Sequence, residues 1–483
     1  MNYKMIGKFT SLILMAEALF MIPALIIGLC LGEKSAISFL ISIGIILAIA
    51  APLWLIGRKT DRRFSARDGF ICVGLGWAMM SLGGSLPFFI SGEIPHFIDA
   101  LFEAVSGFTT TGSSILPNPE LLSKSILYWR SFTHWIGGMG VLVFLLAVVP
   151  IGGGNQGFTM HLLRAESPGP EVGKLMPKMR QTAAVLYSVY ITLTVLDIVF
   201  LLFGKMPLFD AVCTAFGTVG TGGFGIKVDS IASYSPYIQT VTTVFMLLSG
   251  INFSCYYLLL LRNFRSVIKD EELHLYLGLI VTATVLIAIN IRHLFPAGEA
   301  FRHAAFQVSS IISSTGYVTA DFDLWPSLSK AILFALMIVG ACAGSTGGGL
   351  KCARALLLFK GLRRNVSQML RPNRIKTVRV NNRTVDEKIL SNTNAYFATY
   401  ILIIIISFVL VTVGNDFSMG TNFSAVVSCL NNIGPGFEAI GPTCNFAGYG
   451  IFSKCVLIFD MLAGRLEIFP LIILFSPKAW VNR

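Results

Sequence analysis

The chain has 483 residues, of which 54% are hydrophobic and only 13% are charged, and its mean hydropathy is +0.73. A soluble fold cannot cover so much apolar surface, so the composition predicts a polytopic membrane protein. The formal charge of +12 would suit a nucleic-acid partner, but the basic residues gather in turns between apolar segments, which argues against that role. The nine cysteines show no paired spacing and predict neither a disulfide framework nor a metal site.

Ten apolar segments along the chain are long enough to cross a bilayer. Two of them occupy residues 1–66, and the other eight fall in pairs within residues 67–160, 161–268, 269–388 and 389–483. Alternate turns are rich in Lys and Arg, which places both termini in the cytoplasm by the positive-inside bias; such turns also attract anionic lipid. The predicted spans are roughly Phe9–Leu31, Ala36–Ile56, Gly69–Ile90, Ile126–Pro150, Thr182–Phe203, Ile238–Leu261, Leu273–Ile291, Leu328–Phe359, Ala395–Val413 and Ile451–Phe475.

Each of the four pairs of spans encloses a shorter segment that is predicted to re-enter the membrane from outside without crossing it. Non-helical backbone at membrane depth must line a watery cavity or be packed in protein, and a ring of carbonyls there can replace the water shell of a cation. Glycine suits such a ring because it adopts positive φ. The alternative, that Gly and Thr are simply common in membrane helices, is disfavoured by four occurrences in register. The segments are Phe97–Ser114, Leu208–Phe224, Phe301–Tyr317 and Phe423–Gly436, with glycines Gly112, Gly222, Gly316 and Gly434.

A second informative stretch, Gly340–Lys351 (GACAGSTGGGLK), lies inside the span predicted at Leu328–Phe359. Each glycine costs about 1 kcal/mol relative to alanine in a helix, so the stretch predicts a broken helix. A polar segment below a filter could obstruct ions and withdraw, which makes it a candidate gate. The main alternative is close helix packing through small residues. A phosphate-binding loop is disfavoured because no Gly-Lys-Ser/Thr follows and no strand precedes it.

Arg465 lies inside the last predicted span. A central arginine costs roughly 2.5–3.5 kcal/mol on insertion scales and usually faces the protein interior. We therefore hypothesise that Arg465 faces the stretch Gly340–Lys351 and donates hydrogen bonds to its carbonyls. Glu467 is expected to point elsewhere, about 200° around the same helix. The alternative is an arginine that snorkels to the membrane surface.

One polar stretch, Lys376–Val385 (KTVRVNNRTV), alternates valine with polar and basic residues around Asn381-Asn382. Asparagine tolerates the positive φ of a tight turn, so the pattern predicts a short hairpin. A two-stranded hairpin is marginal by itself, and we expect it to pack on a partner or another copy of the chain. The alternative is a solvated, flexible loop.

Several short motifs are spread over nearly the whole chain. They are SGFTTTGSS, WIGGMGVLV at Trp135–Val143, RAESPGP at Arg164–Pro170, CAGSTGGGLK, NNIGPG and GRLEIF. On these motifs the chain resembles the Trk/Ktr/HKT superfamily of potassium transporters, and most closely its bacterial TrkH/TrkG branch. The resemblance implies an all-α membrane protein in which two extra helices precede four membrane–pore–membrane units around a pseudo-fourfold pore, with ten transmembrane helices. It also implies a homodimer with one pore per protomer.

The resemblance also implies roles for residues. In the plant branch a serine in place of the first filter glycine goes with sodium transport, so Gly112 favours potassium. The second loop lacks the bulkier aliphatic residues common in relatives, and the fourth offers Asn431 and Asn432 in place of hydroxyls, which leaves the K⁺/Na⁺ ratio open. The implied K⁺ ligands are Thr110, Thr111, Gly112, Gly220, Thr221, Gly222, Ser314, Thr315, Gly316, Asn432, Ile433 and Gly434. The implied gate comprises Gly340, Gly344, Ser345, Thr346, Gly347, Gly348, Gly349 and Lys351, with Arg465 beside it.

The same resemblance implies a partner. A cytoplasmic RCK-type ring, TrkA, would bind NAD or ATP, dock on the basic loops and control the gate, while this chain carries no cofactor beyond the K⁺ ion. The expected function is potassium uptake across the bacterial inner membrane, without enzymatic activity. The alternative is a Na⁺- or H⁺-coupled secondary cation symporter, which inverted repeats and paired intramembrane acids would favour; the repeats here run in the same orientation.

Overall fold

The computed structural model describes residues 2–58, 66–140, 179–371 and 377–480. Helices make up most of these residues, and the sheet that they contain is a single two-stranded hairpin. Four of the sequence features lie partly or wholly outside the described residues. They are the end of the span predicted at Ile126–Pro150, the end of the motif Trp135–Val143, the motif Arg164–Pro170, and the basic turn over residues 59–65.

Six helices among the described residues are long and apolar enough to cross a membrane. α2, for example, carries no charged residue in 23 positions, so lipid can surround it. A seventh span results if α10 and α11, which meet at 87°, count as one. The ten predicted spans are therefore matched in part. The six helices are α1 (Tyr3–Leu31), α2 (Ser35–Gly57), α3 (Ala66–Ile90), α8 (Met179–Phe203), α13 (Glu271–Ile291) and α17 (Glu387–Val413).

The other predicted spans end early or are broken. α5 (Lys124–Met139) stops at the edge of the described residues, and three further spans are split into two helices each. The breaks fall at Gly250–Asn252, Gly340–Lys351 and Leu466–Ile468. Length and hydropathy alone therefore overestimate how far these helices run straight. The split spans are α10 (Pro236–Ser249) with α11 (Phe253–Leu260), α15 (Ser327–Val339) with α16 (Cys352–Leu370), and α19 (Ile451–Arg465) with α20 (Phe469–Phe475).

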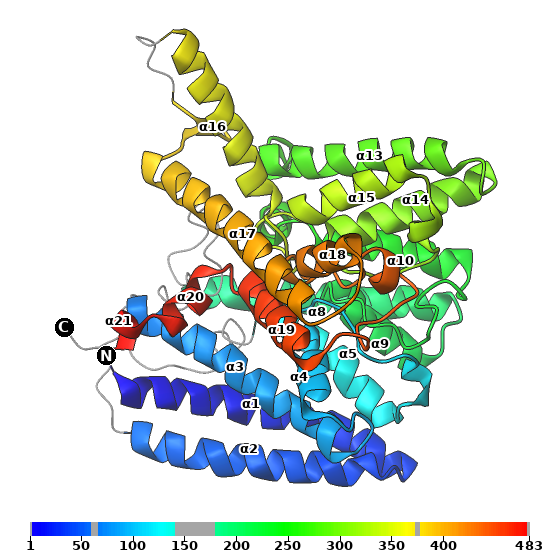
Figure 1. Cartoon of the computed structure of the whole chain (residues 1–483), viewed down its shortest axis with the longest axis vertical. Coiled ribbons are helices and arrows are strands. Elements are labelled where there is room, and N and C mark those ends of the chain that lie inside the picture. The colour runs from blue at the N-terminus through cyan, green and yellow to red at the C-terminus, as the bar shows by residue number, and fades with distance from the viewer. Residues whose placement is uncertain (1, 59–65, 141–178, 372–376, 481–483) are drawn as a thin grey trace.

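One order of elements recurs four times after α1 and α2: a long helix, a short helix and a second helix. The orders are α3–α4–α5, α8–α9–α10, α13–α14–α15 and α17–α18–α19. Figure 1 shows α4, α9 and α18 inside the body, among the longer helices. The short helices are α4 (Phe97–Phe108), α9 (Leu208–Val219), α14 (Ala297–Ile312) and α18 (Met419–Leu430). The minor elements are α12 (Phe264–Ile268), α21 (Pro477–Trp480), η1 (Pro119–Leu121), η2 (Phe322–Leu324) and η3 (Glu438–Ile440).

The two ends of the described chain meet at one side of the molecule (Figure 1). α1 runs along α2, and a Cβ atom at Gly28 would lie 3.1 Å from the Cβ of Ala36, so glycine permits the close approach. The Tyr3 hydroxyl donates to the carbonyl of Trp480 at 2.6 Å. Both termini therefore lie on the same side of the membrane-spanning body.

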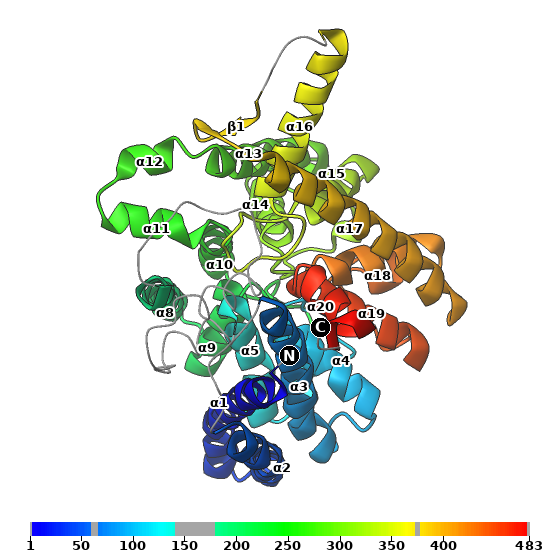
Figure 2. The ribbon, with the colours of Figure 1, turned by 90° about the vertical axis from the view of Figure 1, so that its left-hand side faces the viewer.

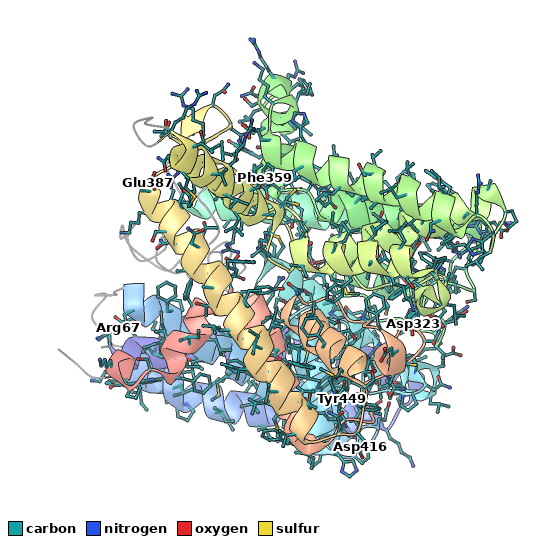
Figure 3. The ribbon with its side chains drawn as sticks, turned by 45° about the horizontal axis from the view of Figure 1, so that its top comes forward. Arg67, Asp323, Phe359, Glu387, Asp416 and Tyr449 are labelled. Atoms are coloured by element: carbon teal, nitrogen blue, oxygen red, sulfur yellow. The ribbon has the colours of Figure 1, made fainter. Side chains whose placement is uncertain are left out.

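α16 leaves the body and projects beyond it together with the hairpin (Figure 2). Arg364 of α16 pairs with Glu387, the first residue of α17. In Figure 3, Phe359 of α16 lies near this start of α17, and α17 runs from there to the loop that carries Asp416. α16 and α17 are thus joined at one end of the molecule.

The predicted hairpin is confirmed, with β1 (Arg379–Val380) paired antiparallel to β2 (Arg383–Thr384). The turn residues Asn381 and Asn382 have φ of 51° and 61°. The hairpin packs on its own chain, because Val378 is buried in a cluster with Leu357 and Leu390. A solvated loop is therefore wrong for this stretch. The expected contact with a partner or another copy of the chain stays a prediction.

The turn of the hairpin gives a first test. Asn381→Val should destabilise the hairpin by about 1–2 kcal/mol, because a β-branched residue resists positive φ. The substitution also removes the hydrogen bond that the side-chain amide nitrogen Nδ2 of Asn381 donates to Asp270 Oδ2 at 2.9 Å. Faster amide hydrogen exchange over residues 378–385 would report the loss. Asn382→Gly is the control and should leave exchange unchanged, since glycine adopts this φ freely.

Candidate functional site

The four short helices end in the same backbone geometry. Each is followed by a residue that takes positive φ, with values of 54° at Thr110, 55° at Thr221, 56° at Ser314 and 53° at Asn432. The amide after it turns back to a carbonyl five residues earlier, as in Thr111 N to Ser106 O at 2.9 Å. Two positions after each of these four residues, a glycine also takes positive φ. These glycines are Gly112 (80°), Gly223 (74°), Gly316 (85°) and Gly434 (100°).

The four loops that follow these short helices touch one another in a closed ring, which we call the loop ring. A Cβ atom at Gly112 would lie 2.2 Å from the carbonyl oxygen of Gly222 in the second loop, and one at Gly223 would lie 1.9 Å from that of Thr315 in the third. A Cβ at Gly316 would lie 2.0 Å from the fourth loop, at Ile433 O. A ring contact of this closeness leaves room for glycine alone. The fourth loop returns to the first, since a Cβ at Gly434 would lie 2.9 Å from Thr111 O.

The backbone geometry of the second loop is offset by one residue from the predicted set. We assigned Gly220, Thr221 and Gly222 to the filter, but Gly220 caps the end of α9 with φ −70°. Thr221, Gly222 and Gly223 occupy the places that Thr110, Thr111 and Gly112 have in the first loop. The adjacent glycines made the sequence ambiguous. All four loops share the pattern of a polar residue, then any residue, then glycine. This pattern could have resolved the register of the second loop.

All four glycines of the ring line one cavity of about 110 Å³. The residues of positive φ that precede them are at most 1% exposed. Asn432 Nδ2 donates to Thr111 Oγ1 and to Met461 O, both at 2.9 Å. Within the described residues, Thr110 Oγ1 and Asn432 Oδ1 are buried without a hydrogen-bond partner. The ring therefore presents oxygen atoms, the ligands that hard monovalent cations accept.

Glu438 joins the third and fourth units beside this cavity. Hydrogen bonds from Ser418 and Thr421 lower the pKa of the Glu438 carboxyl below its ordinary value. Its amide donates to Asp323 Oδ2 at 2.9 Å. Because this pKa is lowered, the hydrogen bonds from Ser418 and Thr421 to the Glu438 carboxylate stabilise the fold at neutral pH, and this contribution is lost as the pH falls through that pKa.

The predicted break in the third unit is present. α15 ends at Val339 and α16 begins at Cys352, and the segment between them takes positive φ at Gly340, Gly344 and Gly349. We call residues 340–351 the gate segment, after the role that the sequence predicts for it. The structure shows, in addition, that this segment lies directly against the loop ring.

The gate segment contacts the inner part of the third and fourth loops. Gly348 N donates to Ser314 Oγ at 2.6 Å. A Cβ at Gly347 would lie 2.8 Å from Ser313 O, and one at Gly348 would lie 2.4 Å from Asn431 O. The segment is therefore packed under the ring, and its glycines allow the approach.

Two buried carboxylates hold the ends of the gate segment. Glu272 of α13 accepts the amide of Ala343 at 2.5 Å and that of Ala353 at 3.1 Å. Glu467 accepts Lys351 at 3.1 Å and also pairs with Arg354. Glu272 was not predicted from the sequence, because an acid at the start of a span is typical of a helix N-terminus.

Arg465 donates to the gate segment, as we hypothesised. Its Nη1 lies 2.8 Å from Thr346 O, and its Nη2 donates to Gly138 O at 2.7 Å and to Gly137 O. The snorkelling alternative is wrong. Arg465 is, however, the last residue of α19, and Glu467 lies within the break with φ 53°. The expectation that Glu467 points away from the gate segment is wrong, because Glu467 pairs with Lys351. The helical rotation that we assumed does not apply across the break.

Known proteins share this architecture over its full length. The family model TrkH, described as a cation transport protein, matches residues 36–482. The chain belongs to the TrkH family. This TrkH-family chain is 34% identical to the Trk system potassium uptake protein TrkH of Salmonella typhimurium, over 99% of this chain and all of the relative. It is also 34% identical to TrkG of Escherichia coli, over 96% of each.

A solved structure agrees with the fold. The crystal structure of the potassium transporter TrkH from Vibrio parahaemolyticus matches with a TM-score of 0.88 over the whole of both chains, at 30% identity. The TrkH-family chain is therefore a helical membrane protein with a transporter fold. The family is one of transport proteins, which points away from enzymatic activity.

Proposed function

We propose that the chain takes up potassium through the loop ring, which acts as a carbonyl-lined selectivity filter. The observation that carries the proposal is the closed contact of four equivalent loops whose glycines line one cavity. Carbonyl oxygens replace the water around a dehydrated ion, and the membrane potential draws the ion inward. The relatives named as potassium uptake proteins support the choice of ion.

The proposal includes the finer architecture. Ten transmembrane helices and four re-entrant short helices surround a pseudo-fourfold pore in the bacterial inner membrane, with the loops facing outward and both termini in the cytoplasm. Potassium contacts the residues of the ring, in the register corrected above: Thr110–Gly112, Thr221–Gly223, Ser314–Gly316 and Asn432–Gly434. The shared end of α1 and α21, joined by Tyr3 and Trp480, supports a common side for both termini.

The gate segment is proposed to close the pore on the inner side of the ring. Its contacts with Ser314 and Asn431 support a position in which it obstructs an ion that leaves the filter. A second copy of the chain and a cytoplasmic ring that binds NAD or ATP complete the assembly in this proposal. The ring would draw the segment aside by acting on α16 and the hairpin, which project from the body.

A coupled cation symporter is the second candidate. Asp197 of α8 and Asp460 of α19 are fully buried within apolar helices. Buried acids in spans often take part in ion or proton coupling. Asp460 accepts the hydroxyl of Ser407 at 2.6 Å, which also gives it a structural role.

Flux measurements in liposomes separate the two candidates. Purified protein is reconstituted with K⁺ as the only ion gradient, and K⁺ movement is followed under an imposed potential. A filter-type conductor passes K⁺ without Na⁺ or a pH gradient. Flux that requires Na⁺ or a pH gradient would replace the first proposal by the symporter, and no K⁺ flux under any gradient would refute both.

A further inference from the structure

A buried ionic cluster lies against the first two loops, and none of its residues belongs to the predicted K⁺ ligands or the gate segment. Glu103 of α4 is 0% exposed and its partner Arg130 of α5 is 3% exposed. His134, one turn further along α5, is also fully buried. Burying such groups is costly unless each polar atom is bonded, so their bonds show what the cluster holds in place.

Glu103 holds the first loop. Its Oε1 accepts the Ser114 hydroxyl at 2.9 Å, and its Oε2 accepts the amide of Ile115 at 3.0 Å. Arg130 Nε donates to the same carboxylate at 2.6 Å. Both carboxylate oxygens are therefore used, and the chain just after Gly112 is tied to α4 and α5 together.

Arg130 and His134 hold the second loop. Arg130 Nη1 donates to Gly225 O at 2.9 Å, and its guanidinium lies 3.6 Å from the centre of the Phe224 ring. Phe224 N lies 3.2 Å from His134 Nε2, and His134 Nδ1 lies 2.8 Å from Gly107 O. A carbonyl can only accept and an amide can only donate, so Nδ1 carries the proton and Nε2 is the acceptor. The imidazole is neutral and joins the end of α4 to the second loop.

The histidine ring also touches the filter backbone. A Cβ at Gly222 would lie 2.1 Å from His134 Cγ, and Gly222 is the residue whose carbonyl meets Gly112. The cluster therefore lies at the contact between the first and second loops.

The cluster is not repeated at the equivalent positions of the fourth unit. Gly137 of α5 and Gly464 of α19 occupy equivalent places, since a Cβ would lie 1.8 Å from Phe108 O and 2.0 Å from Leu430 O respectively. Counting back three and seven residues from Gly464 gives Met461 and Leu457, where α5 has His134 and Arg130. Packing in the fourth unit thus needs no such charges, which argues that they do more than fill space.

We propose that Glu103, Arg130 and His134 are positioning residues that fix the first loop against the second and thereby set cation selectivity. The inference rests on the proposed function, because it assumes that the loops form the filter. Arg130 also lines the cavity, so Glu103 neutralises a positive charge that would otherwise repel a cation at the mouth.

The K⁺/Na⁺ permeability ratio, measured from reversal potentials in reconstituted bilayers, tests the proposal without depending on protein amount. Glu103→Gln and His134→Leu should each lower the ratio three- to tenfold, and Glu103→Gln should also reduce K⁺ conductance at low salt. Arg130→Lys keeps the charge but loses the fork that reaches Gly225, and should lower the ratio as well. His134→Gln can still donate and accept, and should restore most of the ratio.

The matched control is Asp99→Asn. Asp99 lies one turn before Glu103 on α4 and pairs with Lys454 at 2.6 Å, but its partner is on α19 and not on the loop ring. Its ratio should stay at the wild-type value. If a single variant fails to accumulate, the double variant Glu103→Gln/Arg130→Gln and the two conservative variants decide the matter. Wild-type ratios throughout would overturn the proposal, whereas a wild-type protein that conducts no K⁺ would overturn the proposed function instead.

Discussion

Gly112→Ser is expected to lower the K⁺/Na⁺ permeability ratio at least about tenfold, which corresponds to about 1.4 kcal/mol of lost discrimination. Gly112 has φ 80°, a conformation that costs an L residue about 1–2 kcal/mol. A Cβ there would also lie 2.2 Å from Gly222 O, so the first and second loops must separate. Reversal potentials in mixed K⁺ and Na⁺ solutions measure the change, with more Na⁺ passing than in the wild type.

The distance from an added Cβ to the nearest carbonyl oxygen ranks the four glycines of the ring by the expected effect of substitution. Alanine at Gly223 or Gly316 would meet a carbonyl oxygen at 1.9 or 2.0 Å, whereas alanine at Gly434 would meet Thr111 O at 2.9 Å. Gly434→Ala should therefore be the mildest of the four. Gly278→Ala, where a Cβ has no atom within 4 Å, is the control and should leave the ratio unchanged. An equal loss at all four positions would show that a property other than contact closeness controls selectivity.

The repeating parts of the structure were accessible from sequence because they depend on local signals. Short apolar segments that end in glycine predicted the four loops, and glycine density predicted the break after Val339. Asn381 and Asn382 predicted the hairpin turn through their tolerance of positive φ. An arginine within an apolar run predicted the contact of Arg465 with the gate segment. Each signal needed only nearby residues and one physical rule.

Contacts between distant residues were not accessible in this way. Glu272 meets Ala343 across 71 residues, and Arg130 meets Gly225 across 95, and no local pattern announces either pair. The break after Arg465 was missed because Arg465 and Glu467 were placed on one continuous helix inside the predicted span. The register of the second loop was ambiguous in the sequence because Gly222 and Gly223 are neighbours of the same type. Positive φ and the contact with Thr315 mark Gly223 as the equivalent of Gly112.

Arg465→Ala is expected to raise K⁺ flux at least about tenfold in protein reconstituted without any cytoplasmic partner. The guanidinium ties Thr346 O of the gate segment to Gly137 O and Gly138 O of α5. Hydrogen bonds to a charged group are worth roughly 1.5–3 kcal/mol each, and about 1.4 kcal/mol shifts a two-state equilibrium tenfold. Loss of the tie therefore favours withdrawal of the segment from the ring. Initial rates of K⁺ uptake by liposomes measure the change.

Amide hydrogen exchange over the gate segment distinguishes a released gate from a damaged filter. In Arg465→Ala, residues 340–351 should exchange faster while the K⁺/Na⁺ ratio stays near the wild-type value, because Glu272 and Glu467 still hold the ends of the segment. Arg465→Lys should be intermediate, since an ammonium lacks the fork that spans three acceptors. Arg292→Ala, at an exposed position after α13, is the control. Unchanged flux with unchanged exchange would show that the segment is held by its ends alone, and Arg465 would then serve α5 and not the gate.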